Sequence, residues 1–315
     1  MHEAPPADPS GSGPAAGPVP RVSIGVPVHN GSVYLGECLA SLLAQDFEDF
    51  EIIVSDNGST DGTQAICRAF AARDARIRYL RHPENRGAAW NFSRLPRLAR
   101  GEYFRWHCHD DTCDPTQLGT CVRALDAAPD SVVLVYTGTT LIDGDGRVIR
   151  QQGEGLDTVG KPPHARCAQI ASHLGYSNVL YGLARRRALL RTGLLGTYAN
   201  ADYVLISELG LLGEFRELPG HQFRRRVHSG MSRRANTTQE DVAAWFDTAN
   251  RGHRVYFPEL RMLRELNAAV MRAPLGWPEK LLTLWTVPRH WVRRRRWLIA
   301  RELLAPMVPR FRRYA

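Results

Sequence analysis

Residues 21–28 read RVSIGVPV and residues 50–55 read FEIIVS, and these two runs decide the fold. Both are short and rich in β-branched and apolar residues, which is typical of buried strands. Between them, apolar residues recur at helical spacing from Tyr34 to Leu43. A strand, a helix and a strand joined by short turns predict parallel pairing with a right-handed crossover, the building unit of an α/β sheet.

The same alternation continues along the chain. A D-G turn at residues 143–144 predicts a hairpin, and after residue 229 the chain reads as helical and Arg-rich. We therefore expect one mixed, mainly parallel sheet flanked by helices. The further strands are expected at residues 77–80, 103–107, 131–137, 215–218 and 222–227.

The chain divides into three parts by composition. Residues 1–20 are rich in Pro, Gly, Ala and Ser, and we predict a disordered leader because such a segment cannot form a core. Residues 21–232 are expected to form the α/β domain. Residues 233–315 are expected to form a helical, Arg-rich C-terminal extension.

The formal net charge of +9 is concentrated at the C-terminus, where nine Arg and one Glu follow residue 284. A basic C-terminal segment of this kind is expected to bind anionic lipid or nucleic acid, or to be exposed to solvent. The rest of the chain is nearly neutral, which argues against a nucleic-acid-binding face on the domain. Trp and Leu residues interspersed with Arg293 and its neighbours suit the surface of an anionic membrane. The alternative is a helix packed on the domain with its Arg residues in water.

The remaining composition favours a cytoplasmic protein, either free or peripheral at the inner face of the cell membrane. No apolar run approaches the roughly 20 residues that span a bilayer, and the N-terminus lacks the features of a secretory signal. The six cysteines form no C-x-x-C pair, so reduced thiols are favoured over a zinc site at Cys108 and Cys113.

Residues 106–111 read WHCHDD and follow the strand expected at residues 103–107. Carboxylates at the carboxyl end of a strand lie where α/β sheets usually bind ligands, and they are ligands for Mg²⁺ or Mn²⁺. Adjacent side chains of a strand point to opposite sides, so only one of Asp110 and Asp111 is expected to be the primary metal ligand.

Three further motifs precede this stretch in a fixed order. They read PVHN at residues 27–30, DNGSTDGT at residues 56–63 and ENRG at residues 84–87. With HDD at residues 109–111, they resemble the family 2 glycosyltransferases, inverting enzymes of the GT-A fold. The resemblance covers residues 22–229, and the four motifs in order make it specific.

The resemblance implies roles for individual residues. Asp56 contacts the nucleotide base, Asp111 binds the cation and Asp110 faces the ribose or the sugar. Asn57 departs from the family, which usually has an acid there, and His29 stands where Tyr is common. The full set of predicted donor contacts is Pro27, Val28, His29, Asn30, Asp56, Asn57, Arg86 and Asp110, with Arg86 placed to offset diphosphate charge.

In the family, a downstream acid at the start of a helix takes the proton of the acceptor hydroxyl. Asp202 fits that position and is the predicted base, with Glu208 as a rival that helical spacing turns away. The alternative role for Asp202 is a helix N-terminal charge favoured by the macrodipole. His228 is predicted to complete the metal shell or contact the diphosphate, and the alternative is a structural histidine.

The predicted activity is metal-dependent sugar transfer of the hexosyltransferase type, in cell-envelope or surface polysaccharide or glycolipid biosynthesis. The donor is a nucleoside diphosphate sugar with UDP, dTDP or GDP, and the acceptor is a saccharide or is lipid-linked. A nucleotidyltransferase is one alternative, but its Gly-rich basic loop does not match residues 29–31. The other is a non-catalytic protein that binds anionic surfaces.

Overall fold

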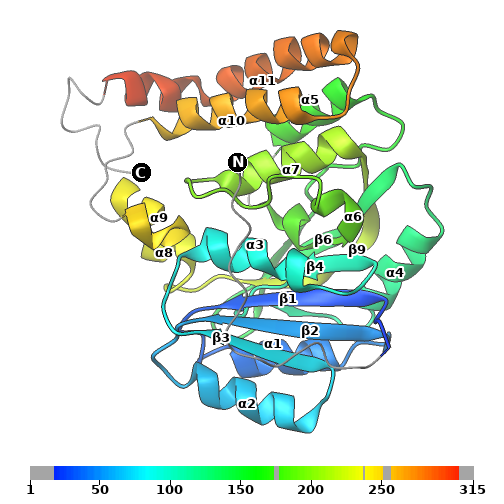
Figure 1. Cartoon of the computed structure of the whole chain (residues 1–315), viewed down its shortest axis with the longest axis vertical. Coiled ribbons are helices and arrows are strands. Elements are labelled where there is room, and N and C mark those ends of the chain that lie inside the picture. The colour runs from blue at the N-terminus through cyan, green and yellow to red at the C-terminus, as the bar shows by residue number, and fades with distance from the viewer. Residues whose placement is uncertain (1–17, 174–176, 237, 251–256, 305–315) are drawn as a thin grey trace.

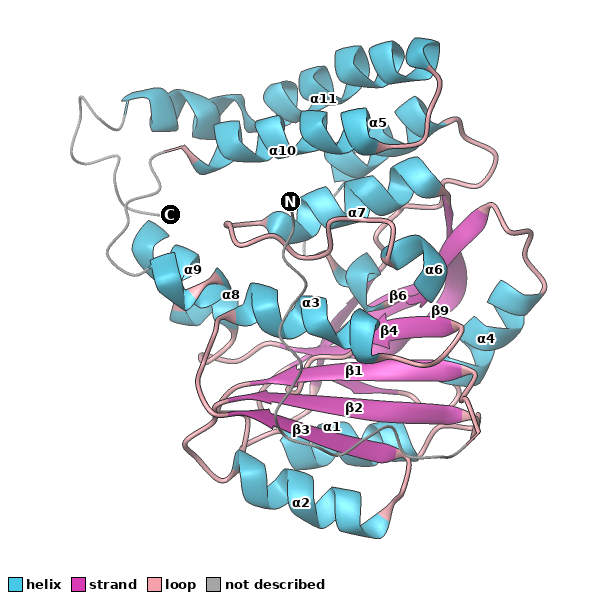
Figure 2. Ribbon diagram, viewed as in Figure 1, coloured by secondary structure: helices cyan, strands magenta, loops and turns pink. Residues whose placement is uncertain are grey.

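The computed structural model describes residues 18–173, 177–236, 238–250 and 257–304. Residues 1–17, most of the predicted leader, lie outside the described residues. The described chain forms one nine-stranded sheet in the order β3-β2-β1-β4-β8-β6-β9-β5, with β7 paired to β6. Helices lie on both sides of the sheet (Figure 2).

The first half of the sheet is parallel. Strands β1 and β2 pair from Val22 with Phe50 to Val28 with Asp56, so both strands end at the same edge. All residues of both strands are buried, as expected for a parallel sheet covered on two faces. The elements of this half are β1 (Val22–Val28), α1 (Leu35–Leu43), β2 (Phe50–Asn57), α2 (Thr63–Arg73), β3 (Ile77–His82), α3 (Ala88–Leu98) and β4 (Tyr103–Trp106).

The second half of the sheet is mixed. β8 pairs antiparallel with β4 and β6, whereas β9 lies parallel to β6 and antiparallel to β5. The predicted hairpin is confirmed as β6 and β7, but the two late strands are one continuous strand, β9. The elements are β5 (Thr112–Cys113), α4 (Gln117–Asp126), β6 (Val132–Ile142), β7 (Val148–Gln152), α5 (Pro163–His173), η1 (Asn178–Tyr181), β8 (Leu183–Arg185), α6 (Arg186–Leu189), α7 (Ala201–Leu212) and β9 (Glu214–Arg226).

Two hydrophobic cores cover the two faces of the sheet. One packs α1 and α4 against β1 through residues such as Leu39 and Leu125. The other packs α3, α5 and α7 against the opposite face through residues such as Leu95 and Leu205. Each fully buried Leu of this kind contributes roughly 1.5–3 kcal/mol. The central strands are therefore fixed from both sides, and their carboxyl ends are rigid supports for a site.

The C-terminal extension is helical and packs on the α/β domain. α11 lies along α5 and α10, and α10 lies on α7, so these helices form the layer farthest from α2 (Figure 1). Trp291 of α11 is buried, with its ring edge-on to Tyr203 of α7 at 6.0 Å. The packed-helix alternative is thus confirmed for one face of α11. The elements are α8 (Ser232–Ala235), α9 (Gln239–Phe246), η2 (Thr248–Asn250), α10 (Pro258–Arg272) and α11 (Trp277–Leu304).

Glu302 near the end of α11 caps the start of α10. Its carboxylate accepts hydrogen bonds from the backbone N–H of Glu259 at 2.8 Å and of Leu260 at 3.4 Å. These N–H groups have no partner inside α10, because the first turn of a helix leaves its donors free. Burial, with the nearby charge of Glu259, raises the pKa of Glu302 to about 7. Among the described residues, no helix is both long enough and apolar enough to cross a bilayer.

Candidate active site

The turns after β1 and β2 are joined at the carboxyl edge of the sheet. His29 Nδ1 lies 3.0 Å from the carbonyl oxygen of Asn57, and the Asn30 carboxamide oxygen accepts the N–H of Thr60 at 2.8 Å. Asn30 has a φ of 53°, a left-handed conformation that Asn tolerates better than most residues. Pro27 and Val28 are buried within β1, whereas His29 and Asn30 are exposed at its end. Of the four predicted donor contacts in this motif, Pro27 and Val28 therefore support the turn from the core, whereas His29 and Asn30 are accessible to a ligand.

Asp56 ends β2 and is fully buried. One carboxylate oxygen accepts the backbone N–H of Ser59 at 2.9 Å, and the other accepts the hydroxyl of Tyr79 at 2.7 Å. Arg81 lies 3.5 Å from the same oxygen and balances its charge. A buried carboxylate with three partners is held in one orientation, which suits a group that recognises a ligand by hydrogen bonds.

Asn57 organises the ENRG loop. Its amide nitrogen donates to Asn85 Oδ1 at 2.9 Å and to the carbonyl of Gly87 at 3.0 Å, and its oxygen accepts the N–H of Arg86 at 3.0 Å. The Arg86 guanidinium stacks over the Trp90 ring at 4.8 Å. The side chain at position 57 is an amide where the family usually has an acid. Two of the groups that face it, Asn85 Oδ1 and the Gly87 carbonyl, are acceptors, and only a donor such as the Asn57 amide can satisfy them.

We expect Asn57→Asp to destabilise the protein by about 1–3 kcal/mol, because a carboxylate would face two unsatisfied acceptors. Chemical denaturation with the fluorescence of the Trp residues measures this. Asn85→Asp is the matched control, since Asn85 Oδ1 only accepts, from Asn57 and from the N–H of Gly87, and a carboxylate preserves both bonds. Equal stability of the two variants would show that the amide of Asn57 is dispensable.

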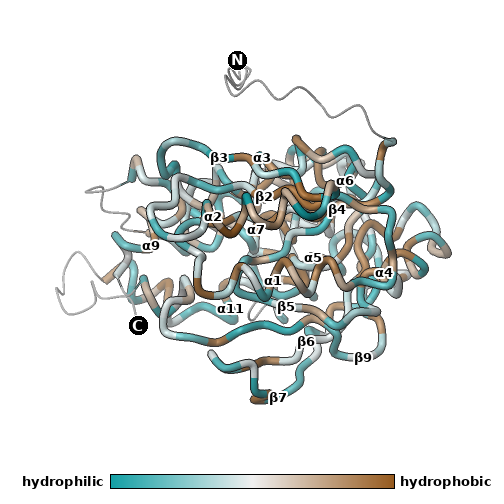
Figure 3. The backbone as a smooth tube through the Cα atoms, turned by 90° about the horizontal axis from the view of Figure 1, so that it is seen from below, coloured by the Kyte–Doolittle hydropathy of each residue, from teal (hydrophilic) through white to brown (hydrophobic). Residues whose placement is uncertain are grey.

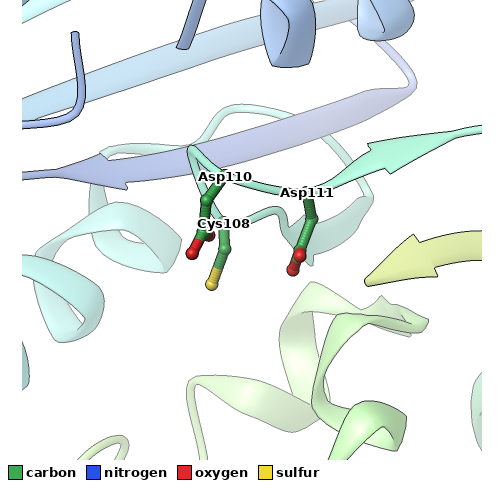
Figure 4. Close-up of side chains that lie close together, drawn as sticks. All are labelled: Cys108, Asp110 and Asp111. Carbon is green, nitrogen blue, oxygen red and sulfur yellow. The ribbon is translucent and has the colours of Figure 1, made fainter. Parts of the chain in front are cut away.

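The acidic motif lies in a turn and not in a strand. β4 ends at Trp106, and the N–H of Asp111 bonds to the carbonyl of Cys108 at 3.2 Å. Asp110 and Asp111 therefore do not point to opposite sides, and the expectation based on strand geometry is wrong. The ligand atoms of Cys108, Asp110 and Asp111 all lie within 4.8 Å of one another, and the three side chains point the same way (Figure 4).

The electrostatics of this cluster favour a bound cation. Burial and the repulsion of Asp110 raise the pKa of Asp111 well above its usual value. Burial alone would raise the pKa of Asp110 too, but the His228 hydrogen bond and the neighbouring His109 lower it to about 2. Burial raises the pKa of the Cys108 thiol, which donates to the Tyr181 hydroxyl at 3.2 Å. The two carboxylates therefore fit Mg²⁺ or Mn²⁺ better than the protonated thiol does.

His107 and Arg226 hold the turn in place. His107 is buried, and its Nε2 bonds to the carbonyl of Asp111 at 3.1 Å; burial and Arg105 lower its pKa to about 3, so the ring is neutral. The N–H of Arg226 donates to Asp111 Oδ1 at 2.8 Å, and its guanidinium bonds to the Asp110 carbonyl at 3.0 Å. The same guanidinium reaches Glu37 at 2.6 Å. Sequence reasoning missed Arg226 because 115 residues separate it from Asp111.

His228 lies beside the acidic turn, where its ring contacts Asp110. Its Nε2 is 3.0 Å from Asp110 Oδ2, and its ring packs at 4.8 Å from the Tyr34 ring. Arg225, also missed from the sequence, interacts electrostatically with Asp111 and Tyr181. The run RRRVH at residues 224–228 was the available signal, because β9 ends there next to the acidic turn.

A cavity of about 520 Å³ adjoins the acidic turn. Tyr181 and Arg225, which contact or face that turn, line one part of it, and Asp202 and Trp245 line another. The volume lies within the range of about 300–1,000 Å³ typical of ligand sites. Asp202 therefore lines the same cavity as Tyr181 and Arg225, the two residues that link this cavity to the acidic turn.

The two acids of α7 differ in their surroundings. Asp202 is in the first turn of the helix and lines the cavity. Glu208 is buried elsewhere, where it accepts the N–H of Gly193 at 2.7 Å and pairs with Arg272 at 2.5 Å. Glu208 is thus committed to a structural ion pair, in agreement with the prediction that helical spacing turns it away.

The sequence of the chain is similar to those of known glycosyltransferases. The model of glycosyl transferase family 2 matches residues 23–192, more than half of the chain. GlyG of Streptococcus pneumoniae is 35% identical over 114 residues, 36% of this chain and 38% of GlyG. Chondroitin synthase of Escherichia coli is 34% identical over 131 residues, 42% of this chain and 19% of the synthase. The chain thus spans well under half the length of these relatives.

Solved structures share the fold. TarS 1–349 of Staphylococcus aureus in complex with UDP-GlcNAc superposes with a TM-score of 0.65 at 17% identity, over 87% of this chain and 73% of that one. The mannosyltransferase PcManGT of Pyrobaculum calidifontis in complex with GDP-Man and Mn²⁺ gives a TM-score of 0.51 at 17% identity, over 93% of this chain and 82% of that one. The chain belongs to glycosyl transferase family 2 and has the GT-A fold.

Proposed function

We propose that the protein is an inverting, metal-dependent glycosyltransferase of the hexosyltransferase type, which moves a sugar from a nucleoside diphosphate sugar to an acceptor hydroxyl. One observation carries this proposal: the turn that holds the buried Asp111 and the half-buried Asp110 adjoins a cavity that Asp202 lines. Family membership favours this reaction over nucleotidyl transfer and over a purely anionic-surface-binding role.

The donor lies along the carboxyl edge of β1, β2 and β4 in this proposal. Asp56 and the turn at His29 and Asn30 receive the base and ribose, with Pro27, Val28 and Asn57 supporting them from behind. Arg86 offsets diphosphate charge. UDP, dTDP and GDP remain the donor classes, and the TarS complex with UDP-GlcNAc and the mannosyltransferase complex with GDP-Man support a nucleotide-sugar site on this fold.

Asp111 and His228 are the proposed ligands of Mg²⁺ or Mn²⁺, and Asp110 faces the donor sugar or ribose from the same turn. When bound, the cation supplies positive charge that stabilises the departing nucleoside diphosphate. The protein's part is to keep both carboxylates close together and shielded from bulk water, with Arg226 and His107 fixing the turn that carries them. The Mn²⁺ complex of the mannosyltransferase supports this choice of ion.

Asp202 is the proposed general base. It takes the proton of the acceptor hydroxyl as the hydroxyl oxygen forms a bond to the anomeric carbon. The bond between that carbon and the diphosphate oxygen breaks on the opposite side, so the configuration inverts and the diphosphate leaves. The cavity holds the acceptor, a saccharide or a lipid-linked saccharide of cell-envelope, surface polysaccharide or glycolipid synthesis, at the cytoplasmic side of the membrane.

A donor screen tests the proposal. Thermal unfolding is measured with UDP, GDP or dTDP, each with and without MnCl₂ or MgCl₂, and hydrolysis of the matching nucleotide sugars is followed. One nucleotide is expected to raise Tm by roughly 4 °C at about 100-fold excess over Kd, and only with the cation. Failure of every nucleotide to stabilise the protein, together with absence of hydrolysis, would refute sugar transfer.

A further inference from the structure

The outer face of α11 carries large apolar side chains in water. Trp277, Leu281 and Trp285 recur every four residues, which places them in one stripe along the helix. They are 64%, 62% and 64% exposed, and Trp297 farther along is 78% exposed. Exposed apolar side chains gathered on one face mark an interaction site more often than an ordinary surface.

The inner face of the same helix is already satisfied. Thr283, Val287 and Trp291 are buried against the domain, so packing within the chain does not require the outer stripe to be apolar. The helix therefore has one apolar face that holds it on the domain and a second that lies free among the described residues.

The charge of the outer face has one sign. Arg289 and Arg293 are exposed along it, Arg289 stacks on the Trp285 ring, and Arg296 is exposed just beyond the kink at Arg295. Both acids of α11 turn inward: Glu279 pairs with His164 at 2.8 Å, and Glu302 caps α10. A face with Trp, Leu and Arg and without an exposed acid is complementary to an anionic surface with an apolar interior.

We propose that the outer face of α11 docks on the surface of an anionic lipid bilayer, with Trp277, Leu281 and Trp285 in the headgroup region and the Arg side chains on lipid phosphates. Amphipathic helices with Trp and Leu on one side and Arg beside them lie in the membrane interface in this way. Each Arg near such a surface strengthens binding, and Trp is favoured at the boundary between water and lipid.

Docking by α11 would bring the acceptor cavity to the membrane. Arg295, Leu298 and Arg301 of the same helix line the cavity that Asp202 also lines. A helix with its side chains is about 10–12 Å across, so the cavity would lie about one helix diameter from the lipid. This arrangement fits an acceptor that is anchored in the bilayer. The docking itself does not depend on the proposed sugar transfer.

Co-sedimentation of the full chain with lipid vesicles tests the inference. The protein is expected to bind vesicles of phosphatidylcholine mixed with phosphatidylglycerol, and to bind pure phosphatidylcholine far more weakly. The triple variant Arg289→Gln, Arg293→Gln, Arg296→Gln is expected to bind the mixed vesicles about 100-fold more weakly, since each Arg contributes roughly a fivefold factor. The variant Trp277→Ser, Leu281→Ser, Trp285→Ser is expected to lose binding as well.

A matched control uses β7, which pairs with β6 and projects from the body of the domain (Figure 3). Val148 and Ile149 are 60% and 53% exposed there, so Val148→Ser with Ile149→Ser removes apolar surface away from α11 and should leave binding unchanged. Undiminished binding of both α11 variants, or equal loss in the β7 control, would overturn the inference. A second result would also overturn it: the wild-type protein binds no vesicles but is a dimer in light scattering, and the variant Trp277→Ser, Leu281→Ser, Trp285→Ser is a monomer. No sugar donor is needed, so this result is independent of the donor screen.

Discussion

Asp111→Asn is expected to lower kcat/KM for sugar transfer by about 10³-fold or more. The carboxylate is buried in the acidic turn, and a cation held there contributes several kcal/mol to stabilising the charge of the leaving diphosphate. Each 1.36 kcal/mol corresponds to a factor of about ten in rate. Initial rates with the donor found in the screen measure the loss.

The same substitution is expected to leave the free energy of unfolding equal or higher. The oxygen of the introduced amide would still accept the N–H of Arg226, and the neutral side chain removes the repulsion that raises the pKa of Asp111 beside Asp110. Asp145→Asn, in the exposed turn between β6 and β7, is the control and should keep both activity and stability. Near-normal transfer by Asp111→Asn would remove this residue from the metal site.

Asp202→Asn is expected to reduce kcat by about 10²–10⁴-fold, the usual contribution of a general base. The amide cannot take the acceptor proton, but it keeps the size of the side chain in the cavity. Because Asp202 lies on α7, away from the turns that we propose to hold the nucleotide, the Kd of the nucleoside diphosphate should stay unchanged. Transfer assays and nucleotide titration on the same preparation separate these two effects.

Glu208→Gln is the matched control on the same helix. Its expected effect is structural: the ion pair with Arg272 is lost at about 1 kcal/mol or less, because Arg272 is half-exposed, while kcat is retained. The opposite pattern, with activity lost in Glu208→Gln and retained in Asp202→Asn, would transfer the role of base to Glu208.

The sequence predicts the first half of the sheet well, for a physical reason. β1 and β2 are buried on both faces, so every residue must suit a core, and short β-branched runs result. Local signals also suffice for the β6–β7 hairpin. The join of two expected strands into β9 was missed because Pro219 and Gly220 interrupt the apolar pattern, although β9 continues through them with its register to β6 shifted.

The candidate site was predictable where its residues follow a strand or begin a helix. Asp56, Asp110 and Asp111 are found by motif and position, and Asp202 by its place at a helix start. The direction of the two adjacent Asp side chains was not predictable, because it depends on where β4 stops, and β4 ends at Trp106, before both of them. Arg225 reaches the turn only through strand pairing across the sheet.

The contacts of Arg226 also imply that the acidic turn is completed late during synthesis of the chain. This residue joins the acidic turn to Glu37 of α1 and to the carbonyl of Gly144 at 3.0 Å, and it follows Asp111 by 115 residues. At about 5–20 residues per second of synthesis, the turn waits roughly 6–23 s for its last support. A nascent chain that ends before β9 has every acidic residue of the site yet lacks the strand that locks them. Ligand affinity should therefore arise late, when the final strand joins the sheet.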